Sequence, residues 1–175
     1  MSVQSARRQA ESLIASLGIT QAPVNVEDVA KHLGLRVIPM ELEEDVSGLL
    51  ITKPDMSCIV VRKDDALARQ RFTIAHEIGH FVLRHQFEPG EHVHVDRGYR
   101  VSHRDQRSSS GTDLREIEAN QFAAALLMPS SIVTGNIKAL GAEELNDEHV
   151  TNLARKFRVS EQAMTIRLSV LGHLL

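Results

Sequence analysis

Apolar residues recur at helical spacing near the start of the chain and give way to short apolar runs after residue 34. A first helix is predicted over residues 4–17, where apolar positions lie three and four apart and Gly18 follows as a C-terminal cap. A second, shorter helix is predicted between Asn25, a suitable N-cap, and Gly34. Three segments rich in Val, Ile and Leu are then predicted as strands of a small, mostly antiparallel sheet: LRVIPMEL, VSGLLIT and SCIVVRK.

Helical spacing returns in the second half of the chain. A long helix is predicted from a cap at Asp64 or Asp65 to about His85. Residues 86–113 show no period and contain Gly, Pro, Ser, Arg and His, which is typical of a long loop or lid. Further helices are predicted at about residues 112–127, 130–140, 147–157 and 160–172. The order of two helices, a small sheet and then helices predicts an α+β fold.

The composition narrows the class of protein. At 175 residues the chain can form one domain with a substantial core, and its formal net charge of -3 gives no support to a dominant role on nucleic acid or a membrane surface. The apolar runs are shorter than the roughly 20 residues that span a bilayer, and the first residues lack a signal-peptide pattern. The single cysteine, Cys58, excludes an internal disulfide. We expect a soluble, cytoplasmic protein without a membrane partner.

The sequence HEIGH at residues 76–80 brings potential chemistry into the long helix. His76 and His80 are four residues apart, so they lie about 40° from each other and one turn along, where both imidazoles can reach one ion. Glu77 lies beside them, in the position of a general base that faces a metal-bound water. Gly79 leaves part of the helix without a side chain, and we expect a neighbour to pack closely there.

The alternative is an amphipathic helix that carries two histidines by chance, and with nine His in the chain the motif alone does not exclude it. Apolar residues surround the motif almost completely, however: Phe72, Ile74, Ala75, Ile78, Phe81, Val82 and Leu83. Burying two imidazoles and a carboxylate without partners costs several kcal/mol, so the pattern favours a metal site.

A third ligand must come from elsewhere in the chain. The extended motif HExxHxxGxxH would need Gly and His where this chain has Leu83 and Gln86, so that arrangement is excluded. On the helix predicted at 112–127, Glu116 and Asn120 share one face, so Glu116 could ligate the ion while Asn120 hydrogen-bonds the far nitrogen of a ligating His. Glu118 is the competing ligand; it points about 160° away from Asn120 round the helix, and Glu116 is favoured.

RFTIAHEIGHFVLRH, followed by RSSSGTDLREIEANQFAAALLMP, resembles the ImmA/IrrE family of metallopeptidases, and VNVEDVAKHLGLRV and VSGLL extend the similarity over about residues 20–130. The resemblance implies that His76, His80 and Glu116 bind zinc, with manganese as the alternative, and that Glu77 is catalytic. It further implies cleavage of a helix-turn-helix repressor or an antitoxin-like partner that controls stress-response or mobile-element genes.

The expected architecture combines these features. A small three-stranded sheet would pack on a zincin-like helical core, with residues 1–130 as the catalytic part and residues 131–175 as a C-terminal helical subdomain of a single domain. The substrate would bind as an added strand, at an exposed sheet edge near residues 46–61. An oxyanion donor is also expected, and the candidates in the predicted lid are Tyr99, Arg100 and His103.

Other histidines could be mistaken for ligands. His85 is five residues after His80, off the ligand face, and is predicted to be exposed. The sequence HVHV, which contains His92 and His94, alternates like a strand and is interpreted as a polar strand face rather than a metal site.

The last third of the chain supports a rival function. LARKFRVSEQAMTIRL resembles a helix-turn-helix and carries four basic residues: Arg155, Lys156, Arg158 and Arg167. Arg158, however, occupies the turn position where Gly is usual, and Glu148 and Glu161 dilute the charge. A DNA-binding regulator with a structural or vestigial metal site is therefore the alternative, and packing or partner docking by these helices is favoured over DNA contact.

Overall fold

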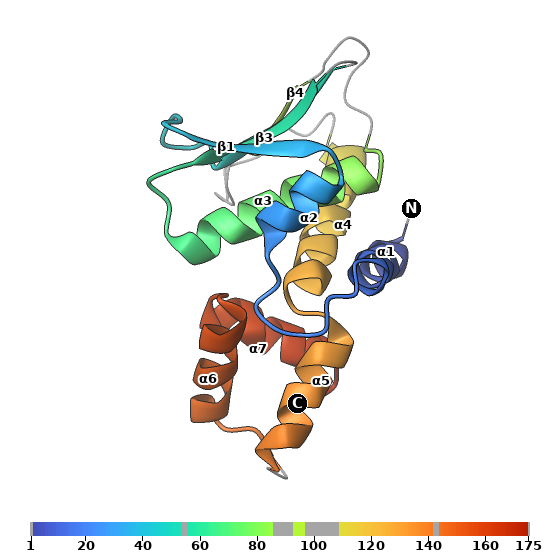
Figure 1. Ribbon diagram of the computed structural model, residues 1–175, viewed down its shortest axis with the longest axis vertical. Helices are drawn as coiled ribbons and strands as arrows, with labels where there is room; N and C mark the ends of the chain where they lie inside the picture. Colours follow the sequence, from blue (N-terminus) through green and yellow to red (C-terminus); the bar gives the residue numbers. More distant parts are fainter. Residues whose placement is uncertain (1, 54–55, 86–92, 97–108, 142–143, 175) are drawn as a thin grey trace.

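The computed structural model describes residues 2–53, 56–85, 93–96, 109–141 and 144–174. The described residues form seven helices and four strands, which confirms the predicted α+β class. In chain order they are α1 (Val3–Ser16), α2 (Val26–His32), β1 (Leu35–Met40), β2 (Gly48–Lys53), β3 (Met56–Arg62), α3 (Leu67–Val82), β4 (Val93–Asp96), α4 (Ser109–Leu127), α5 (Ser130–Leu140), α6 (Asp147–Phe157) and α7 (Glu161–Val170). Figure 1 shows the sheet at one end, α5, α6 and α7 at the other, and α3 and α4 between them.

The sheet has one strand more than the three predicted. Its described strands lie in the order β1-β3-β2-β4, because the four-residue strand β4 lies inside the segment predicted as a loop. The sheet is mostly antiparallel, as predicted: β2 runs antiparallel to both β3 and β4, while β1 runs parallel to β3. Among the described strands, β2 and β3 each have a neighbour on both sides and the edges are β1 and β4. The prediction of an exposed edge near 46–61 is therefore wrong.

Helix α3 is shorter than its prediction at both ends. It begins at Leu67, and its N-cap, Ala66, makes no side-chain cap hydrogen bond, so neither predicted aspartate caps it. The helix ends at Val82 because Arg84 takes a left-handed conformation with φ 53°. Helix α4 begins at Ser109, earlier than predicted, because Ser and Gly cost at most about 1 kcal/mol each within a helix.

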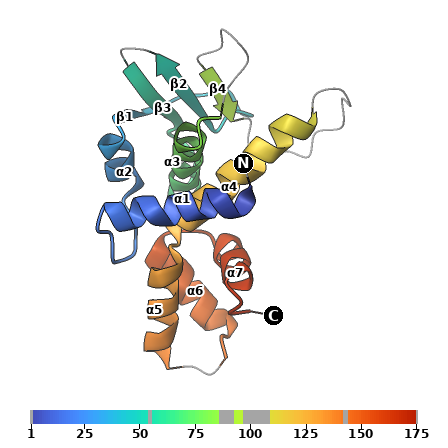
Figure 2. The same ribbon diagram turned by 90° about the vertical axis from the view of Figure 1, so that its right-hand side faces the viewer.

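The core is built around α3. One face of the sheet contributes buried side chains such as Leu50, Ile59 and Val61, and α3 is buried continuously from Thr73 to His80. Helix α4 packs against both α3 and α1, and Figure 2 shows α1 lying across α4. The HEIGH motif is therefore enclosed between the sheet and α4.

Gly79 allows α3 and α4 to approach closely, as its position in the motif predicted. A Cβ atom at this residue would lie 3.2 Å from the carbonyl oxygen of Ala119 and 3.2 Å from Cδ1 of Phe122. Both neighbours belong to α4 and are fully buried. The missing side chain thus sets the distance between the two helices that carry the candidate ligands.

We expect Gly79→Ala to destabilise the protein by about 1 kcal/mol, because overpacking of about 1–3 kcal/mol outweighs the gain of about 1 kcal/mol in helix propensity. The free energy of unfolding in urea measures this change. Gly135→Ala in α5 is the matched control, since nothing lies within 4 Å of a Cβ at Gly135 and the same substitution there should stabilise. Equal stabilisation by both substitutions would contradict the close packing.

Two arginines join the C-terminal helices to the rest of the molecule. Arg71 of α3 donates hydrogen bonds to the carbonyl oxygens of Val24, Phe157 and Arg158. Arg167 of α7 is 3% exposed and donates to the carbonyl oxygen of Met128 and to Glu11 of α1. These contacts anchor α6 and α7 on the core.

No single described helix has the length and apolar composition to cross a membrane. The segments Leu114–Leu127 and Ser130–Leu140, which meet at 46°, have them only as a bent pair.

Candidate metal centre

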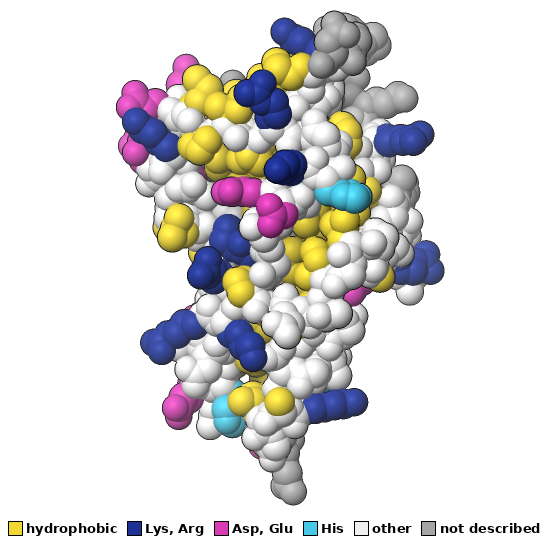
Figure 3. All heavy atoms as spheres, in the orientation of Figure 1, with side chains coloured by type: hydrophobic (Ala, Val, Ile, Leu, Met, Phe, Trp, Pro, Cys, Tyr) yellow, Lys and Arg dark blue, Asp and Glu magenta, His cyan; other side chains and the backbone are white. Residues whose placement is uncertain are grey.

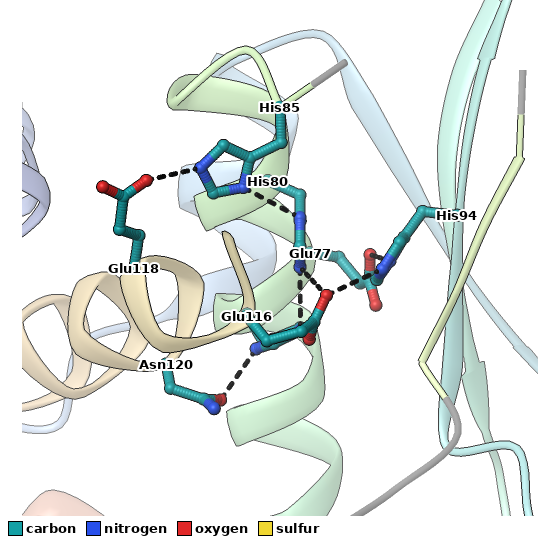
Figure 4. Close-up of polar contacts among 8 residues, drawn as sticks. Glu77, His80, His85, His94, Glu116, Glu118 and Asn120 are labelled. Atoms are coloured by element: carbon teal, nitrogen blue, oxygen red, sulfur yellow. Dashed lines mark hydrogen bonds and ion pairs between the residues drawn. The ribbon is translucent and has the colours of Figure 1, made fainter. Parts of the chain in front are cut away.

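Helix α3 presents two imidazoles at one point. His76 and His80, one turn apart, have their Nε2 atoms 3.0 Å from each other, and the two residues are 3% and 1% exposed. Figure 4 shows the ring of His80 next to the carboxylate of Glu116, which comes from α4. A buried pair of nitrogen lone pairs at this distance is suited to share one cation.

Helix α4 adds the carboxylate of Glu116. Its Oε2 lies 3.2 Å from Nε2 of His76, and its Oε1 lies 3.3 Å from Nε2 of His80. One ligand atom from each of the three residues lies within 4.8 Å of those from the others. The structure thus brings together the three residues that the sequence predicted as ligands, and it does so with Glu116 rather than Glu118.

These distances fit a tetrahedral ion. Bonds of about 2.0–2.1 Å to nitrogen and oxygen place the corners of a tetrahedron about 3.3 Å apart. The observed separations of 3.0, 3.2 and 3.3 Å match that spacing. Two His and one Glu also form a known donor set of catalytic zinc sites, which leaves the fourth position for water or substrate. The residues present therefore fit a divalent metal ion.

Each imidazole is held from behind by a different partner. Nδ1 of His76 lies 2.9 Å from Oδ1 of Asn120, the contact that the sequence predicted. Because an amide oxygen only accepts, Nδ1 carries the hydrogen and Nε2 keeps its lone pair for the ion. The far nitrogen of His80 contacts His85 instead, with 3.0 Å between the two Nδ1 atoms.

The prediction that His85 is exposed is wrong. Its side chain is only 6% exposed, and its Nε2 lies 3.1 Å from Oε2 of Glu118. The left-handed Arg84 turns the chain back so that the N–H of His85 donates to the carbonyl oxygen of His80, which places the ring over α3. Burial lowers the pKa of His85 from its ordinary value, although Glu118 opposes the shift.

His94 is a site residue that the sequence reasoning missed. Its Nδ1 lies 3.1 Å from Oε2 of Glu77, and its Nε2 lies 3.2 Å from Oε1 of Glu116. The alternation in HVHV did predict a strand, but His94 faces the site rather than solvent, because it is paired with buried Leu50 of β2 and shares that inner face. The strand signal alone could not say which face is buried.

The electrostatics of the site favour metal binding. Burial lowers the pKa of His80 to about 3, so its imidazole is neutral and available as a ligand. Burial alone would raise the pKa of Glu116, but its contacts with His76, His80 and His94 outweigh burial and hold the pKa well below its usual range. The ligand carboxylate is therefore ionised.

The pKa of His94 is shifted in the opposite direction from that of His80. Burial alone would lower its pKa, but hydrogen bonds to Glu116 and Glu77 outweigh burial and raise the pKa to about 10. A divalent ion on Glu116 would oppose this shift, because it neutralises the carboxylate that favours the imidazolium.

Glu77 lies between the sheet and the candidate ligands and is fully buried. A Cβ at Gly48 of β2 would lie 2.3 Å from Cγ2 of Thr73 and 3.8 Å from Oε1 of Glu77. Gly48 therefore lets β2 lie directly against the part of α3 that carries Glu77. The predicted oxyanion donors Tyr99, Arg100 and His103 lie outside the described residues.

A sequence model of the peptidase family described as the IrrE N-terminal-like domain (Peptidase M78) matches residues 30–169. The chain belongs to this family. The resemblance drawn from HEIGH and EIEAN is thereby confirmed.

This member of the IrrE N-terminal-like family is also similar to a phage protein and to a solved structure. It is 26% identical over 110 residues to the uncharacterized immunity region protein 2 of Bacillus phage phi105, and the match covers 63% of this chain and 62% of the phage protein. The structure of a Mycobacterium tuberculosis transcriptional regulator matches 96% of this chain with a TM-score of 0.61 and 17% identity, and the match covers 47% of that chain. The second likeness shows a shared fold.

Proposed function

We propose that this chain is a metal-dependent endopeptidase that hydrolyses a peptide bond in one specific protein substrate. The observation that carries this proposal is the convergence of His76, His80 and Glu116 at tetrahedral spacing, with Glu77 beside them on α3. Zinc is the proposed ion because two imidazoles and one carboxylate suit it, and manganese is the alternative.

A bound divalent ion would lower the pKa of a coordinated water toward about 7 and polarise the scissile carbonyl. Glu77 removes a proton from the attacking water, whose oxygen forms the new C–O bond at the carbonyl carbon. Glu77 then returns the proton to the amide nitrogen, so the peptide C–N bond breaks and an amine and a carboxylate are released. His94 holds the Glu77 carboxylate through its Nδ1, 3.1 Å away, and thereby keeps the base in one orientation.

Strand β4 is the proposed platform for the substrate. It is an edge of the sheet among the described residues, and it carries His94 at the site. An extended peptide that pairs with this edge would pass next to the candidate ligands, with main-chain hydrogen bonds supplying affinity. This assignment replaces the edge near 46–61 predicted from the sequence.

The proposed substrate is a helix-turn-helix repressor or an antitoxin-like partner, whose cleavage induces stress-response or mobile-element genes. The family resemblance supports this choice, as does the immunity-region name of the phage relative. We also propose that residues 1–130 form the catalytic part and residues 131–175 a helical subdomain in the same domain.

The rival proposal is DNA binding by α6 and α7. Helix α7, which would be the recognition helix, exposes the side chains of Glu161, Gln162, Thr165, Ile166, Ser169 and Val170, while its basic residue Arg167 is buried against Glu11. Figure 3 shows the Lys and Arg side chains of one face separated mostly by uncharged and apolar atoms, without a continuous basic stripe. These features favour packing or protein docking over DNA contact.

The test is incubation of the purified protein with the transcription factor encoded beside its gene, followed by mass spectrometry of the products. A single cut that requires a divalent ion is expected. An intact substrate, combined with salt-dependent binding of a specific duplex by the full chain, would favour the rival proposal.

We expect His94→Ala to lower kcat by about 10²-fold at saturating metal, because the base loses the contact that orients it and small misplacements are costly. Steady-state cleavage with increasing metal separates this effect from weaker metal binding. His32→Ala, at an exposed histidine of α2, is the control and should leave kcat unchanged. An unaltered kcat in His94→Ala would remove His94 from the proposed mechanism.

A further inference from the structure

A buried chain of polar side chains extends from His80 on the side away from the ligand atoms. Nδ1 of His80 contacts Nδ1 of His85 at 3.0 Å, and Nε2 of His85 contacts Oε2 of Glu118 at 3.1 Å. The side chains of His85 and Glu118 are each 6% exposed, and that of His80 is 1% exposed. Figure 4 shows the three side chains in a row, with Glu118 on α4 beyond the ring of His85.

The donor and acceptor roles of Glu118, His85 and His80 are fixed by the carboxylate at one end. A carboxylate only accepts hydrogen bonds, so the hydrogen between Glu118 and His85 belongs to Nε2 of His85. The other nitrogen of that neutral ring then accepts, so Nδ1 of His80 donates to it. Nε2 of His80 is left with a lone pair that points toward His76 and Glu116, as a metal ligand requires.

The position of the His85 ring against α3 requires a left-handed backbone conformation at the preceding residue, Arg84. Arg84 has φ 53°, which costs an L-residue with a side chain about 1–2 kcal/mol. This turn lets the N–H of His85 donate to the carbonyl oxygen of His80 and returns the ring to α3. Glu118 reaches the same ring from α4, so two separate elements of the fold converge on it.

We propose that His85 and Glu118 are positioning residues, with Glu118 acting through His85 to hold His80 in the orientation and tautomer that bind the metal. This inference rests on the proposed metal site and deepens it. Glu118, which the sequence analysis gave as the alternative to Glu116 as third ligand, is thereby assigned to the support of His80 through His85. His80 is supported by a carboxylate–histidine pair, whereas His76 is supported by the amide of Asn120.

The test is the zinc affinity of the full chain, measured by competition with a chromogenic chelator. We expect His85→Ala to weaken zinc binding by about 10–100-fold and Glu118→Gln, which has the same shape, by about 10-fold. The double variant should bind as His85→Ala does, because Glu118 reaches the metal only through His85. Circular dichroism of each apo-protein verifies the fold, and Glu118→Gln alone decides if His85→Ala does not fold.

Cobalt(II) provides a second readout. The visible spectrum of the cobalt form should keep its tetrahedral intensity in Glu118→Gln, because the three ligands are unchanged. Single variants that bind zinc within twofold of the natural protein, or a double variant whose loss is the product of the two single losses, would overturn the positioning role. A natural protein that binds no zinc and no cobalt would overturn the metal site itself, which distinguishes the two failures.

Discussion

Glu77→Gln is expected to bind its divalent ion normally and to cleave the partner protein about 10²–10⁴-fold more slowly than the natural protein. Glu77 is fully buried beside His76 and contacts His94, so an amide of the same shape keeps the packing. The amide has no lone pair basic enough to take a proton from the attacking water. Single-turnover cleavage, with the metal content measured on the same samples, tests this expectation.

Metal removal is the matched control for that variant. A chelator should abolish cleavage by the natural protein, and added zinc or manganese should restore it, whereas no metal should restore Glu77→Gln. Cleavage by Glu77→Gln at the natural rate, or cleavage that survives the chelator, would exclude the proposed mechanism.

Glu116→Gln is expected to weaken metal binding by more than the roughly 10–100-fold that loss of an outer hydrogen bond causes. The reason is that the ionised Glu116 carboxylate lies 3.2 and 3.3 Å from the two ligand nitrogens, and its charge offsets that of the ion. Titration calorimetry, or chelator competition where binding is tight, measures the change.

Glu118→Gln is the control, because it removes a carboxylate from the same helix at a residue that contacts His85 instead of the ligand nitrogens. Its effect on affinity should be clearly smaller, with the cobalt spectrum preserved. A larger loss in Glu118→Gln than in Glu116→Gln would reverse the ligand assignment.

The arrangement of the candidate ligands on their own helices could be predicted from local spacing. Residues four apart lie on one helix face whatever surrounds them, so HEIGH places His76 and His80 together, and Glu116 and Asn120 likewise. Close packing at Gly79 could also be predicted, because a residue without a side chain leaves room for a neighbouring helix. The bounds of α2, α5 and α6 agree with the predictions, and local signals account for one end of each: Asn25 caps α2, Asn146 caps α6, and the left-handed Gly141 ends α5.

Contacts between different helices and strands could not be predicted from the local spacing of residues in the sequence. The left-handed turn at Arg84 buries His85, although its distance from His80 on an ideal helix predicted an exposed ring. The pairing of β4 with β2 places His94 on the inner face, a choice that alternation alone leaves open. The parallel pairing of β1 with β3 likewise depends on how the chain crosses the sheet.

By itself the sequence determined the α+β order of elements, the helical pair of imidazoles with its adjacent base, and the face of α4 that carries the third candidate ligand. Only the tertiary structure decided that Glu116 meets the imidazoles, that Glu118 lies behind His85, and that His94 reaches Glu77. The physical reason is range. Helical periodicity and caps depend on residues within about one turn, whereas these contacts depend on the packing of α3 against α4 and on the register of β4, which join segments far apart in the chain.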